Sequence, residues 1–513
     1  MMIQQSEIPG GTERSLGRTV RRAARGLALA AGMTALTPLA MAQGRQPAPP
    51  AAAPQETVVR LVGAASVGSK MTMTAAMSWA KQQKLSGVRV EPGVDPDEYE
   101  VVAEGAESTK RLRVYVKAKG TGFGLEQLLR GEIDFWMAAR EIRESDLAKM
   151  RKAGVPNVPT LEQMRTPGIE NVVALSAMAV VVNQRNPVQQ LSYAQLRDIY
   201  QGRISSWAQV GGPSNMPIGL YSPEPTLATS DFFCAAVMGL PETLKCLDSF
   251  ARLAAPRITL MDDISDAVAG NPAGISFVDY GSRRSSKPIA LANECGTGIE
   301  PSLFRIKTDE YSLTRKHHYY IHPTRPLSPA AKDFLAHVLG PQGQQAAVAA
   351  GLADLSPGVA DGSYGGDRLD AARETMDGGR TRVRMADVRA FETATSGAER
   401  LTITFRFQAG TNALDSRAEA DITRLAQFLA QPANVNTTVS LIGFSGSAGD
   451  YTENRTLSSE RANAVRERLM AAGVTSVNAV GVGPTAAIAC NLDPAQAVLN
   501  QRVEVWLRRN QRS

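Results

Sequence analysis

Three segments of the sequence place glycine, serine and threonine where a predicted strand gives way to a predicted helix. They are residues 63–69 (GAASVGS), 119–124 (KGTGFG) and 221–230 (YSPEPTLATS). The start of a helix leaves N–H groups unpaired and carries a partial positive charge, so it attracts anions. Hydroxyl groups at the same turns add further donors. Three such turns meeting at one point would form a cage for an oxyanion without a large net charge.

Arg140 follows a predicted strand at 135–139 and would add a bidentate contact to an oxyanion. Each turn taken singly also has an ordinary structural role. Serine and threonine cap helices, and glycine serves tight turns. The presence of all three turns in one α/β chain favours a ligand cleft.

An alternation of apolar strands with helices must position these turns, and it indicates an α/β domain over residues 58–355. Strands are predicted at 58–62, 111–116, 135–139, 172–183, 218–221, 275–278 and 311–321, and helices at 70–83, 125–130, 193–200 and 330–349. The last helix contains Gly340-Pro341, where a break is expected.

Residues 356–397 are rich in Gly, Asp and Arg and poor in large apolar residues, which predicts a linker. A second domain follows over 398–513. Its predicted strands are 401–407, 437–444, 477–482 and 502–507, and its predicted helices are 418–430 and 458–472. This order describes a compact α+β or α/β unit.

Residues 1–42 have the pattern of a signal peptide. Four arginines between positions 18 and 25 precede an apolar run at 27–39, and Ala40-Met41-Ala42 has the small residues of a cleavage site. The alternative is a short amphipathic helix. Residues 43–57 are a Pro/Ala-rich linker. No later stretch of 18 apolar residues occurs, so no transmembrane span is expected in the mature chain.

The charge pattern argues against a nucleic-acid partner. The net charge is +6, from 56 basic and 50 acidic residues. Five of these basic and two of these acidic residues lie in 1–42, so the rest of the chain carries only +3. Aromatic residues make up 5% of the chain, too few for a broad base-stacking surface. A nucleic-acid binder would keep a basic excess in its folded part.

Export would place the four cysteines in an oxidising compartment. Cys234 and Cys246 flank a Gly-Leu-Pro turn, and we predict a disulfide between them. Two separately buried thiols are the alternative. Cys295 and Cys490 fall in different predicted domains, and the sequence leaves their pairing open.

No pattern indicates a catalytic or metal site. His317, His318 and His322 cluster at the end of the strand predicted at 311–321 and are expected to face solvent. No HExxH or CxxC metal motif, GxSxG turn, phosphate-binding Walker loop or dinucleotide fingerprint occurs. The sequence therefore predicts a protein that is not an enzyme and needs no cofactor.

Residues 58–355 resemble the PstS-like, phosphate-type periplasmic solute-binding domain. The most specific stretch is AVVVNQRNPVQQLSYAQLRDIYQGRISSWAQVGG at 179–212. The resemblance implies a two-lobed, type II-like periplasmic-binding-protein fold that closes on an oxyanion, with phosphate the expected ligand. The implied ligand-binding residues are Ser66, Thr121, Gly122, Phe123, Arg140, Ser222, Thr229 and Ser230. The third turn lacks the family's usual arginine and glycine, and Glu224 adds a negative charge there.

Residues 398–513 resemble the OmpA-like peptidoglycan-binding domain, a small α/β sandwich. The resemblance rests on LIGFSGSAGD at 441–450 and on NRTLSSERANAV at 454–465. It implies that Arg461, with Asn454 nearby, binds a carboxylate of the peptidoglycan peptide. The family's aspartate, which pairs with an ammonium group, falls on Gly446, so peptidoglycan binding is expected to be weakened. Asp450 is a candidate substitute.

The leading hypothesis is a non-enzymatic protein of the periplasm, associated with the cell wall or outer membrane. One domain would capture phosphate or another oxyanion, and the other would attach the protein to peptidoglycan. An envelope transporter or sensor is a conceivable partner. The alternative is an envelope scaffold whose two ligand sites are degenerate, and a hydrolase ranks third because no metal site is found.

Overall fold

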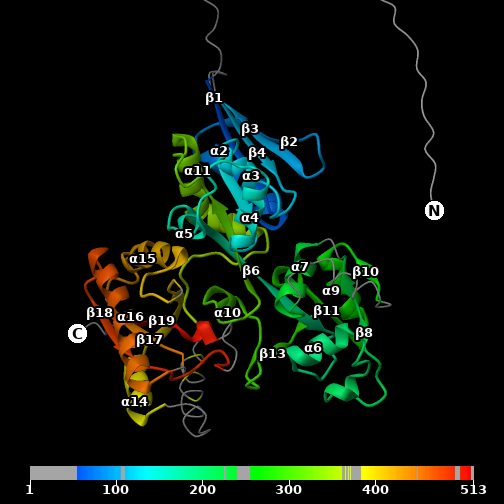
Figure 1. The fold of residues 1–513 in the computed structure, drawn as a ribbon, viewed down its shortest axis with the longest axis vertical. Coiled ribbons are helices and arrows are strands. Elements are labelled where there is room, and N and C mark those ends of the chain that lie inside the picture. Colours follow the sequence, from blue (N-terminus) through cyan, green and yellow to red (C-terminus); the bar gives the residue numbers. More distant parts are fainter. Residues whose placement is uncertain are drawn as a thin grey trace, which may run out of the picture. The chain divides into compact units, whose positions relative to one another are not determined.

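The computed structural model describes residues 55–105, 110–224, 227–239, 255–360, 364, 368, 370, 383–408, 410–446, 449–491 and 497–509 (Figure 1). The predicted signal peptide at 1–42 and nearly all of the linker predicted at 43–57 lie outside them. Within these ranges, no helix combines the length and the apolar character that a membrane crossing requires.

The first lobe is built on parallel pairing of β1 with β4 and β5. Alternate residues of β1, such as Val59 and Leu61, are fully buried. The elements of this lobe are β1 (Gln55–Gly63), α1 (Ala65–Val67), a π-helical turn (Gly68–Thr72), α2 (Met73–Gln82), β2 (Ser86–Pro92), β3 (Glu98–Glu104), β4 (Lys110–Lys117), α3 (Leu125–Leu129), β5 (Phe135–Ala138), α4 (Glu144–Lys152) and α5 (Leu161–Met164).

The antiparallel pair β2 and β3 was not predicted. β2 forms the edge of the sheet, and most of its residues are exposed. An exposed edge strand carries polar and charged residues, so the apolar alternation that marks a buried strand is missing.

The long strand β6 (Glu170–Val182) joins the two lobes. Its first half pairs with β15 (Thr314–Tyr320), and its second half pairs with β11 (Gly274–Asp279), both antiparallel. Nearly all of β6 is buried, which explains its continuous apolar run. The sheet order β2-β3-β4-β1-β5-β15-β6-β11-β8 places β15 and β6 at its centre, and we refer to these two as the crossing strands.

The second lobe surrounds the far half of β6, and its core includes Tyr200, Phe233 and Phe277 in mutual ring contact. Its elements are β7 (Gln190–Ser192), α6 (Tyr193–Tyr200), a 3-10 turn (Trp207–Val210), β8 (Gly219–Leu220), β9 (Ser222–Pro223), α7 (Ala228–Ala236), β10 (Arg257–Ile258), α9 (Met261–Gly270), β11, a 3-10 turn (Tyr280–Ser282), β12 (Lys287–Pro288), β13 (Ala290–Ala292), β14 (Gly298–Ile299) and α10 (Leu303–Lys307).

The helix predicted at 330–349 is broken as expected. α11 (Pro329–Leu339) ends before Gly340, whose backbone is extended, and α12 (Pro341–Ala349) begins with proline. Both helices return to the first lobe, where Phe334 and Ala346 join the core around α2.

The C-terminal domain forms a separate four-stranded sheet in the order β16-β19-β17-β18. Its elements are α14 (Met385–Thr395), β16 (Glu399–Phe405), α15 (Ser416–Leu429), β17 (Thr437–Phe444), α16 (Tyr451–Ala471), β18 (Val477–Gly481), a 3-10 turn (Val498–Asn500) and β19 (Arg502–Arg509). α16 begins seven residues before the predicted start at 458, because the carboxylate of Asp450 accepts hydrogen bonds from the N–H groups of Thr452 and Glu453 and caps the helix.

Part of the segment predicted as a linker pairs with this second sheet. Ala360 donates its N–H to the carbonyl oxygen of Arg400 at 2.7 Å, and Gly358 donates to the Thr402 hydroxyl at 2.8 Å. Tyr364 is buried and donates to a carboxylate oxygen of Glu310 at 2.5 Å. At least these residues of the segment therefore have fixed partners.

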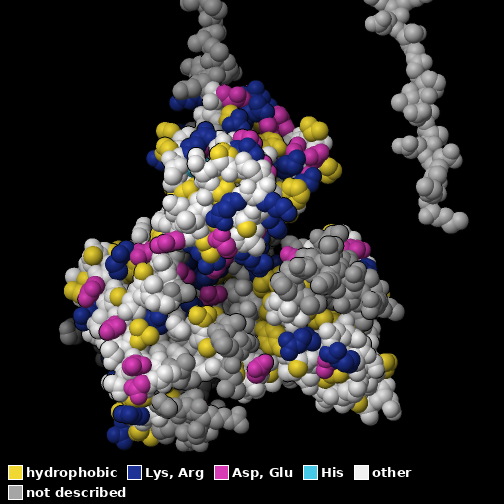
Figure 2. Space-filling view, viewed as in Figure 1, with side chains coloured by type: hydrophobic (Ala, Val, Ile, Leu, Met, Phe, Trp, Pro, Cys, Tyr) yellow, Lys and Arg dark blue, Asp and Glu magenta, His cyan; other side chains and the backbone are white. Residues whose placement is uncertain are grey.

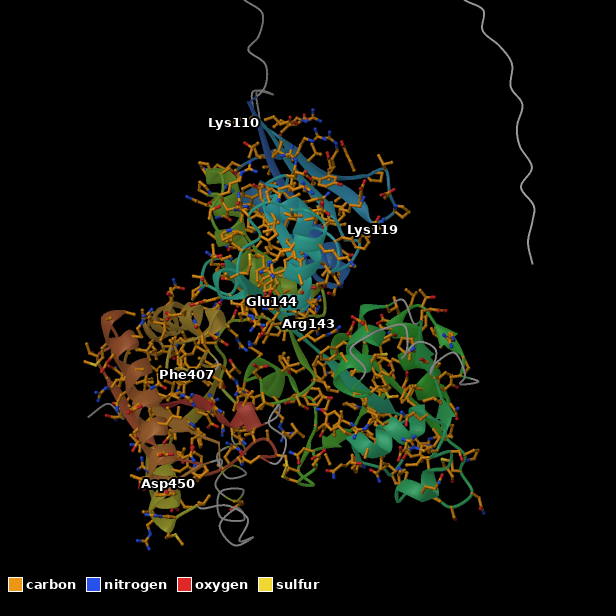
Figure 3. All side chains as sticks on the ribbon, in the orientation of Figure 1. Lys110, Lys119, Arg143, Glu144, Phe407 and Asp450 are labelled. Carbon is orange, nitrogen blue, oxygen red and sulfur yellow. A yellow bond between two sulfur atoms is a disulfide. The ribbon has the colours of Figure 1, made fainter. Side chains whose placement is uncertain are left out.

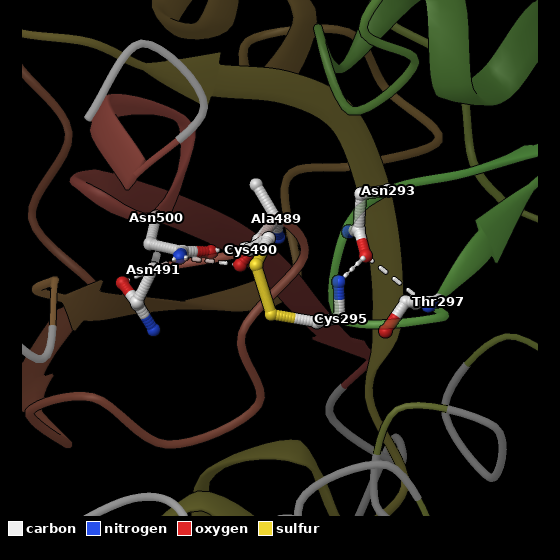
Figure 4. Close-up of a disulfide and its surroundings, with 7 residues drawn as sticks. All are labelled: Asn293, Cys295, Thr297, Ala489, Cys490, Asn491 and Asn500. Carbon is white, nitrogen blue, oxygen red and sulfur yellow. Dashed lines mark hydrogen bonds between the residues drawn. A yellow bond between two sulfur atoms is a disulfide. The ribbon is translucent and has the colours of Figure 1, made fainter. Parts of the chain in front are cut away.

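Several contacts join the two domains within the described ranges. The Ser416 hydroxyl donates to the carbonyl oxygen of Arg165 at 2.8 Å, and Lys316 of β15 lies 3.5 Å from a carboxylate oxygen of Asp415. A disulfide joins Cys295 to Cys490 (Figure 4). The C-terminal domain thus touches the first lobe, a crossing strand and the second lobe.

The visible surface around α4 and α5 mixes basic and acidic side chains (Figure 2). α4 itself carries Glu144 and Asp146 in its first turn and Lys149, Arg151 and Lys152 in its last. This distribution complements the helix dipole and leaves no field of one sign on that element.

Candidate functional site

The first predicted turn follows β1 and leads into α1. Gly63 has a φ of +145°, and a Cβ there would lie 2.0 Å from the carbonyl oxygen of Met137, so only glycine is accommodated. The chain then enters α1, where Ser66 is half-buried. Its hydroxyl lies 3.4 Å from Nδ1 of His317 on β15. The first turn therefore reaches the crossing strands.

The second turn lies beside the end of β5. The Thr121 hydroxyl accepts the backbone N–H of Ala139 at 3.0 Å, next to Arg140. Gly122 and Phe123 are exposed, and the centroid of the Phe123 ring lies 5.2 Å from Nζ of Lys119. Of the predicted residues in this turn, the structure brings Thr121 toward Arg140 and leaves the Phe123 side chain partly in solvent.

Arg140 is held in a two-bond ion pair with Asp146. Its Nη1 and Nη2 donate to the two carboxylate oxygens at 2.7 and 2.8 Å. Burial disfavours the charged form of Arg140, but Asp146 outweighs burial and holds the guanidinium pKa above its ordinary value. The negative charge of Asp231 on α7 also raises the pKa of Arg140, so a residue of the second lobe contributes to the electrostatic environment of this arginine. A ligand oxyanion would have to share this arginine with Asp146.

The third turn uses its hydroxyl groups within the protein. Ser222 is buried and donates to the carbonyl oxygen of Pro223 at 3.2 Å, and Ser230 donates to that of Glu224 at 2.8 Å. These two hydroxyls can therefore accept a hydrogen bond from a ligand but cannot donate one to it. Thr229 donates to Oδ1 of Asp279 at 3.1 Å.

Four polar residues of the crossing strands and β11 lie beside Ser66 and Thr229, and the sequence did not identify them as candidate site residues. Ser176 of β6, Arg315 and His317 of β15, and Asp279 of β11 are buried or half-buried. Oγ of Ser176 lies 2.9 Å from Nε2 of His317, and Arg315 forms an ion pair with Asp279. The one available signal was the uninterrupted polar run at 314–318 within the strand predicted at 311–321.

The expectation that the histidines face solvent is wrong for two of the three. His317 and His318 are 0% and 1% exposed, because β15 lies inside the sheet with neighbours on both edges. Burial, followed by the charge of Arg315 and of His318, lowers the pKa of His317 well below its ordinary value. Burial, followed by the charge of Lys316, lowers the pKa of His318 to about 3. Both rings are therefore neutral at neutral pH.

No group of three or more His, Cys, Asp or Glu side chains in the described ranges is arranged to hold a metal ion. The groups that do converge are hydroxyls, two arginines with their carboxylates, and a neutral imidazole. Of these groups, the arginines can donate hydrogen bonds to a small anion, whereas the carboxylates can only accept them.

The C-terminal domain contains a second candidate site around Arg461. This residue of α16 is 3% exposed, and its guanidinium carbon lies 4.9 Å from the ring centroid of Phe407. Nη2 donates to the carbonyl oxygen of Thr411 at 3.2 Å, whereas Nε and Nη1 have no hydrogen-bond partner in the described part of the chain. Burial lowers the pKa of Arg461. Unpaired buried donors favour a ligand that supplies oxygens.

Asp450 does not lie beside Arg461. It caps α16, and Arg461 is eleven residues further along the same helix, about 16 Å at 1.5 Å per residue. Phe407 and Asp450 are also well separated in Figure 3. Asn454 donates to the carbonyl oxygen of Asp450 at 3.0 Å and so belongs to the start of the helix. Gly446 follows β17, and a Cβ there would lie 3.7 Å from Oδ1 of Asn491, in ordinary contact.

The disulfide between Cys295 and Cys490 could not be assigned from the sequence. Cys295 lies in the turn between β13 and β14, where Asn293 accepts the N–H groups of Cys295 and Thr297 (Figure 4). Cys234 is buried on α7 and disulfide-bonded. Its predicted partner, Cys246, lies outside the described residues, so that pairing stays a prediction.

Comparison with known families gives one match in each domain. Residues 94–342 match the PBP superfamily domain, and residues 406–500 match the OmpA family.

Among individual proteins, the chain is 27% identical over 223 residues to Protein SphX of Synechococcus elongatus, a match that covers 41% of this chain and 60% of SphX. It is 26% identical over 249 residues to the phosphate-binding protein PstS of Staphylococcus saprophyticus, covering 47% of this chain and 71% of that protein. The structure of an ABC-type phosphate transport receptor from Vibrio cholerae aligns at 20% identity with a TM-score of 0.41, over 58% of this chain and 99% of that one.

Proposed function

Since the chain joins a PstS-like solute-binding domain to an OmpA-family domain, we propose that it is an envelope protein that captures an oxyanion and attaches to peptidoglycan. Phosphate is the proposed oxyanion. The observation that carries the first part is the convergence of hydroxyls and arginines on the crossing strands. Ser66, Thr229 and Arg315 each contact a residue of β11 or β15 there, although they come from separate parts of the chain.

The chemistry of the cleft supports an anion rather than an apolar ligand. Thr121 and Arg140 lie at the end of β5, and Arg315 adds a second guanidinium from β15. Guanidinium groups bind phosphate oxygens through two parallel N–H donors. The related PstS protein of S. saprophyticus is described as phosphate-binding, which supports phosphate as the oxyanion.

Attachment to peptidoglycan rests on Arg461. Its two unpaired, buried N–H donors would receive a carboxylate of the peptide stem, next to the ring of Phe407. Gly446 supplies no charge for an ammonium group, so this attachment is expected to be weaker than a site with both charges. Binding to peptidoglycan would place the protein in the periplasm, in agreement with the proposed signal peptide.

One observation favours a scaffold as the second candidate. The hydroxyls of Ser222 and Ser230 donate to carbonyl oxygens of their own turn, and Arg140 is already paired with Asp146. If these polar groups need no ligand, their role would be to hold the fold together and not to bind an anion. Oxyanion binding separates the two candidates.

The test is thermal unfolding of the full mature chain, freed of bound anions by dialysis, with and without millimolar phosphate or sulfate. An anion at 100 times its Kd adds about 2.7 kcal/mol to the stability of the folded state, which is a clear shift in Tm. A shift with phosphate and none with sulfate supports phosphate capture. Identical Tm values with every oxyanion would leave the scaffold as the better account.

A further inference from the structure

The start of α7 carries an unusual charge for an anion site. Residues 222–231 contain no lysine or arginine, and they include Glu224 and Asp231. Asp231 lies in the first turn of α7. The segment alone would repel an anion, so any attraction at this side of the cleft must come from another element.

Arg315 brings a positive charge to this helix from the crossing strand β15. Its side chain is 3% exposed and forms an ion pair with Asp279 of β11. The guanidinium carbon lies 5.1 Å from the ring centroid of Phe232, on α7. The same Asp279 oxygen accepts the Thr229 hydroxyl. Arg315 is therefore fixed against the first turns of α7 through a carboxylate that the helix also contacts.

Arg315 keeps donor capacity that the protein does not use. Its Nε is buried and has no hydrogen-bond partner among the described residues. An arginine carries five N–H donors in a planar fork, and the structure shows Nη2 bound to Asp279. A buried donor without an acceptor costs free energy, and a ligand oxygen would remove that cost. Arg140 differs, because Asp146 already occupies its Nη1 and Nη2.

We infer that Arg315 binds the oxyanion beside α7 and β11 and supplies the positive charge that the start of α7 lacks. The inference rests on the proposed oxyanion function and names the residue on which it depends most. On this lobe the Thr229 hydroxyl donates to the same Asp279 oxygen as Arg315 and so helps to hold the carboxylate that orients the guanidinium. Asp279 neutralises Arg315 when the cleft is empty and keeps the guanidinium oriented.

The test is isothermal titration of the dialysed mature chain with inorganic phosphate, in parallel with the variant Arg315→Gln. We expect the variant to bind phosphate at least about 100-fold more weakly, because it loses a buried, charge-assisted contact. Arg203→Gln is the matched control. Arg203 lies in the same lobe, its side chain is 63% exposed and it pairs with Asp198. This control should bind within about twofold of the unsubstituted chain.

A second variant distinguishes the loss of a ligand contact from misfolding. Arg315→Gln leaves the partly buried Asp279 carboxylate without its guanidinium partner, so the double variant Arg315→Gln/Asp279→Asn removes both charges together. Its folding is checked by its unfolding temperature without anion, and it should also lose phosphate affinity. Phosphate binding by a folded double variant within about threefold of the unsubstituted chain would overturn the role of Arg315. If the unsubstituted chain itself binds neither phosphate nor sulfate, the proposed function fails, and this inference fails with it.

Discussion

Arg140 at the end of β5 and Arg461 of α16 are the two arginines for which the sequence predicts a ligand contact, but they differ in their partners. Arg140 is 27% exposed at its side chain and shares two hydrogen bonds with Asp146. Arg461 is 3% exposed and has two donors without an acceptor in the described ranges. Both Nη groups of Arg140 therefore have hydrogen-bond acceptors, whereas Nε and Nη1 of Arg461 have none among the described residues.

This difference sets how much each arginine gains from a ligand. An arginine whose two Nη groups are both bound to a carboxylate, as in Arg140, must share or exchange that carboxylate, so the net gain from a new anion is small. An unpaired buried arginine has already lost its water, so a ligand carboxylate adds nearly the full strength of a charge-assisted hydrogen bond. Within the described residues, Nε and Nη1 of Arg461 have no acceptor, and a buried donor without an acceptor lowers the stability of the fold.

The largest expected effect follows from removing Arg461. Arg461→Met should weaken the binding of the mature chain to purified peptidoglycan at least 100-fold, equivalent to about 2.7 kcal/mol. The same change should not lower the free energy of unfolding, because it replaces an unpaired buried charge with an apolar side chain of similar length. Cosedimentation and urea unfolding measure the two quantities.

Arg468→Met is the matched control for this variant. Arg468 lies on the same helix, is 57% exposed at its side chain and pairs with Glu419. It should leave peptidoglycan binding unchanged. A marked loss of stability in Arg461→Met would show that the empty domain depends on this arginine, and the contrast with Arg140 would disappear.

A second substitution adds to the OmpA-like site the charge that it lacks. Gly446→Asp should tighten peptidoglycan binding about tenfold, because a new carboxylate can pair with an ammonium group of the ligand. Gly446 does not have a positive φ, and a Cβ fits there without a clash, so the change is structurally tolerated. Gly446→Asn supplies the same volume without charge and should have no effect. Equal affinity for both variants argues against an ammonium subsite.

The smallest expected effect concerns the paired arginine. Asp146→Asn should lower the free energy of unfolding by about 1 kcal/mol near pH 7, because the pair is partly exposed. The control is Glu144→Gln in the same helical turn, where the side chain is 58% exposed and the effect should be near zero. A loss above about 3 kcal/mol would mean that Arg140 behaves as a buried charge, as Arg461 does.

The effect of Asp146→Asn should also depend on pH. Burial raises the pKa of Asp146, but Arg140 outweighs burial, and the folded pKa lies below the ordinary value of 3.8. A lowered carboxyl pKa contributes stability that is fully present above the unfolded pKa and is lost as the pH falls through the folded pKa. The difference between the unsubstituted chain and the variant should therefore be constant above about pH 5 and shrink below pH 3.8. Urea unfolding across this range measures it.

Local sequence patterns predicted the long buried strands and several of the helices, and the limits of these predictions have physical causes. Tyr193–Tyr200 and Thr437–Phe444 lie where the sequence predicted them, because the helix buries one face and the strand is buried along nearly its whole length. β2 was missed because an exposed edge strand carries no apolar pattern. The burial of His317 was missed because a polar side chain inside a sheet needs partners from other strands, which the sequence of β15 does not reveal.

The sites follow the same division. The sequence predicted the turns that contain Ser66 and Thr121. In the structure, Ser66 lies beside His317 of β15, and Thr121 lies beside the end of β5. The sequence could not locate Arg315, because the partners Asp279 and Phe232 lie 36 and 83 residues away along the chain. Contacts at such separations arise only from the paths of β6, β11 and β15.

The disulfide between Cys295 and Cys490 also determines what proteolysis can do to this protein. The two residues are 195 positions apart and enclose β15, α11, α12 and most of the OmpA-like domain. A single cut at any peptide bond between them leaves two pieces that are still covalently joined. Such a nicked chain would run as separate fragments on a reducing gel and as one species without reductant. The solute-binding domain cannot therefore be shed from the OmpA-like domain by one cleavage.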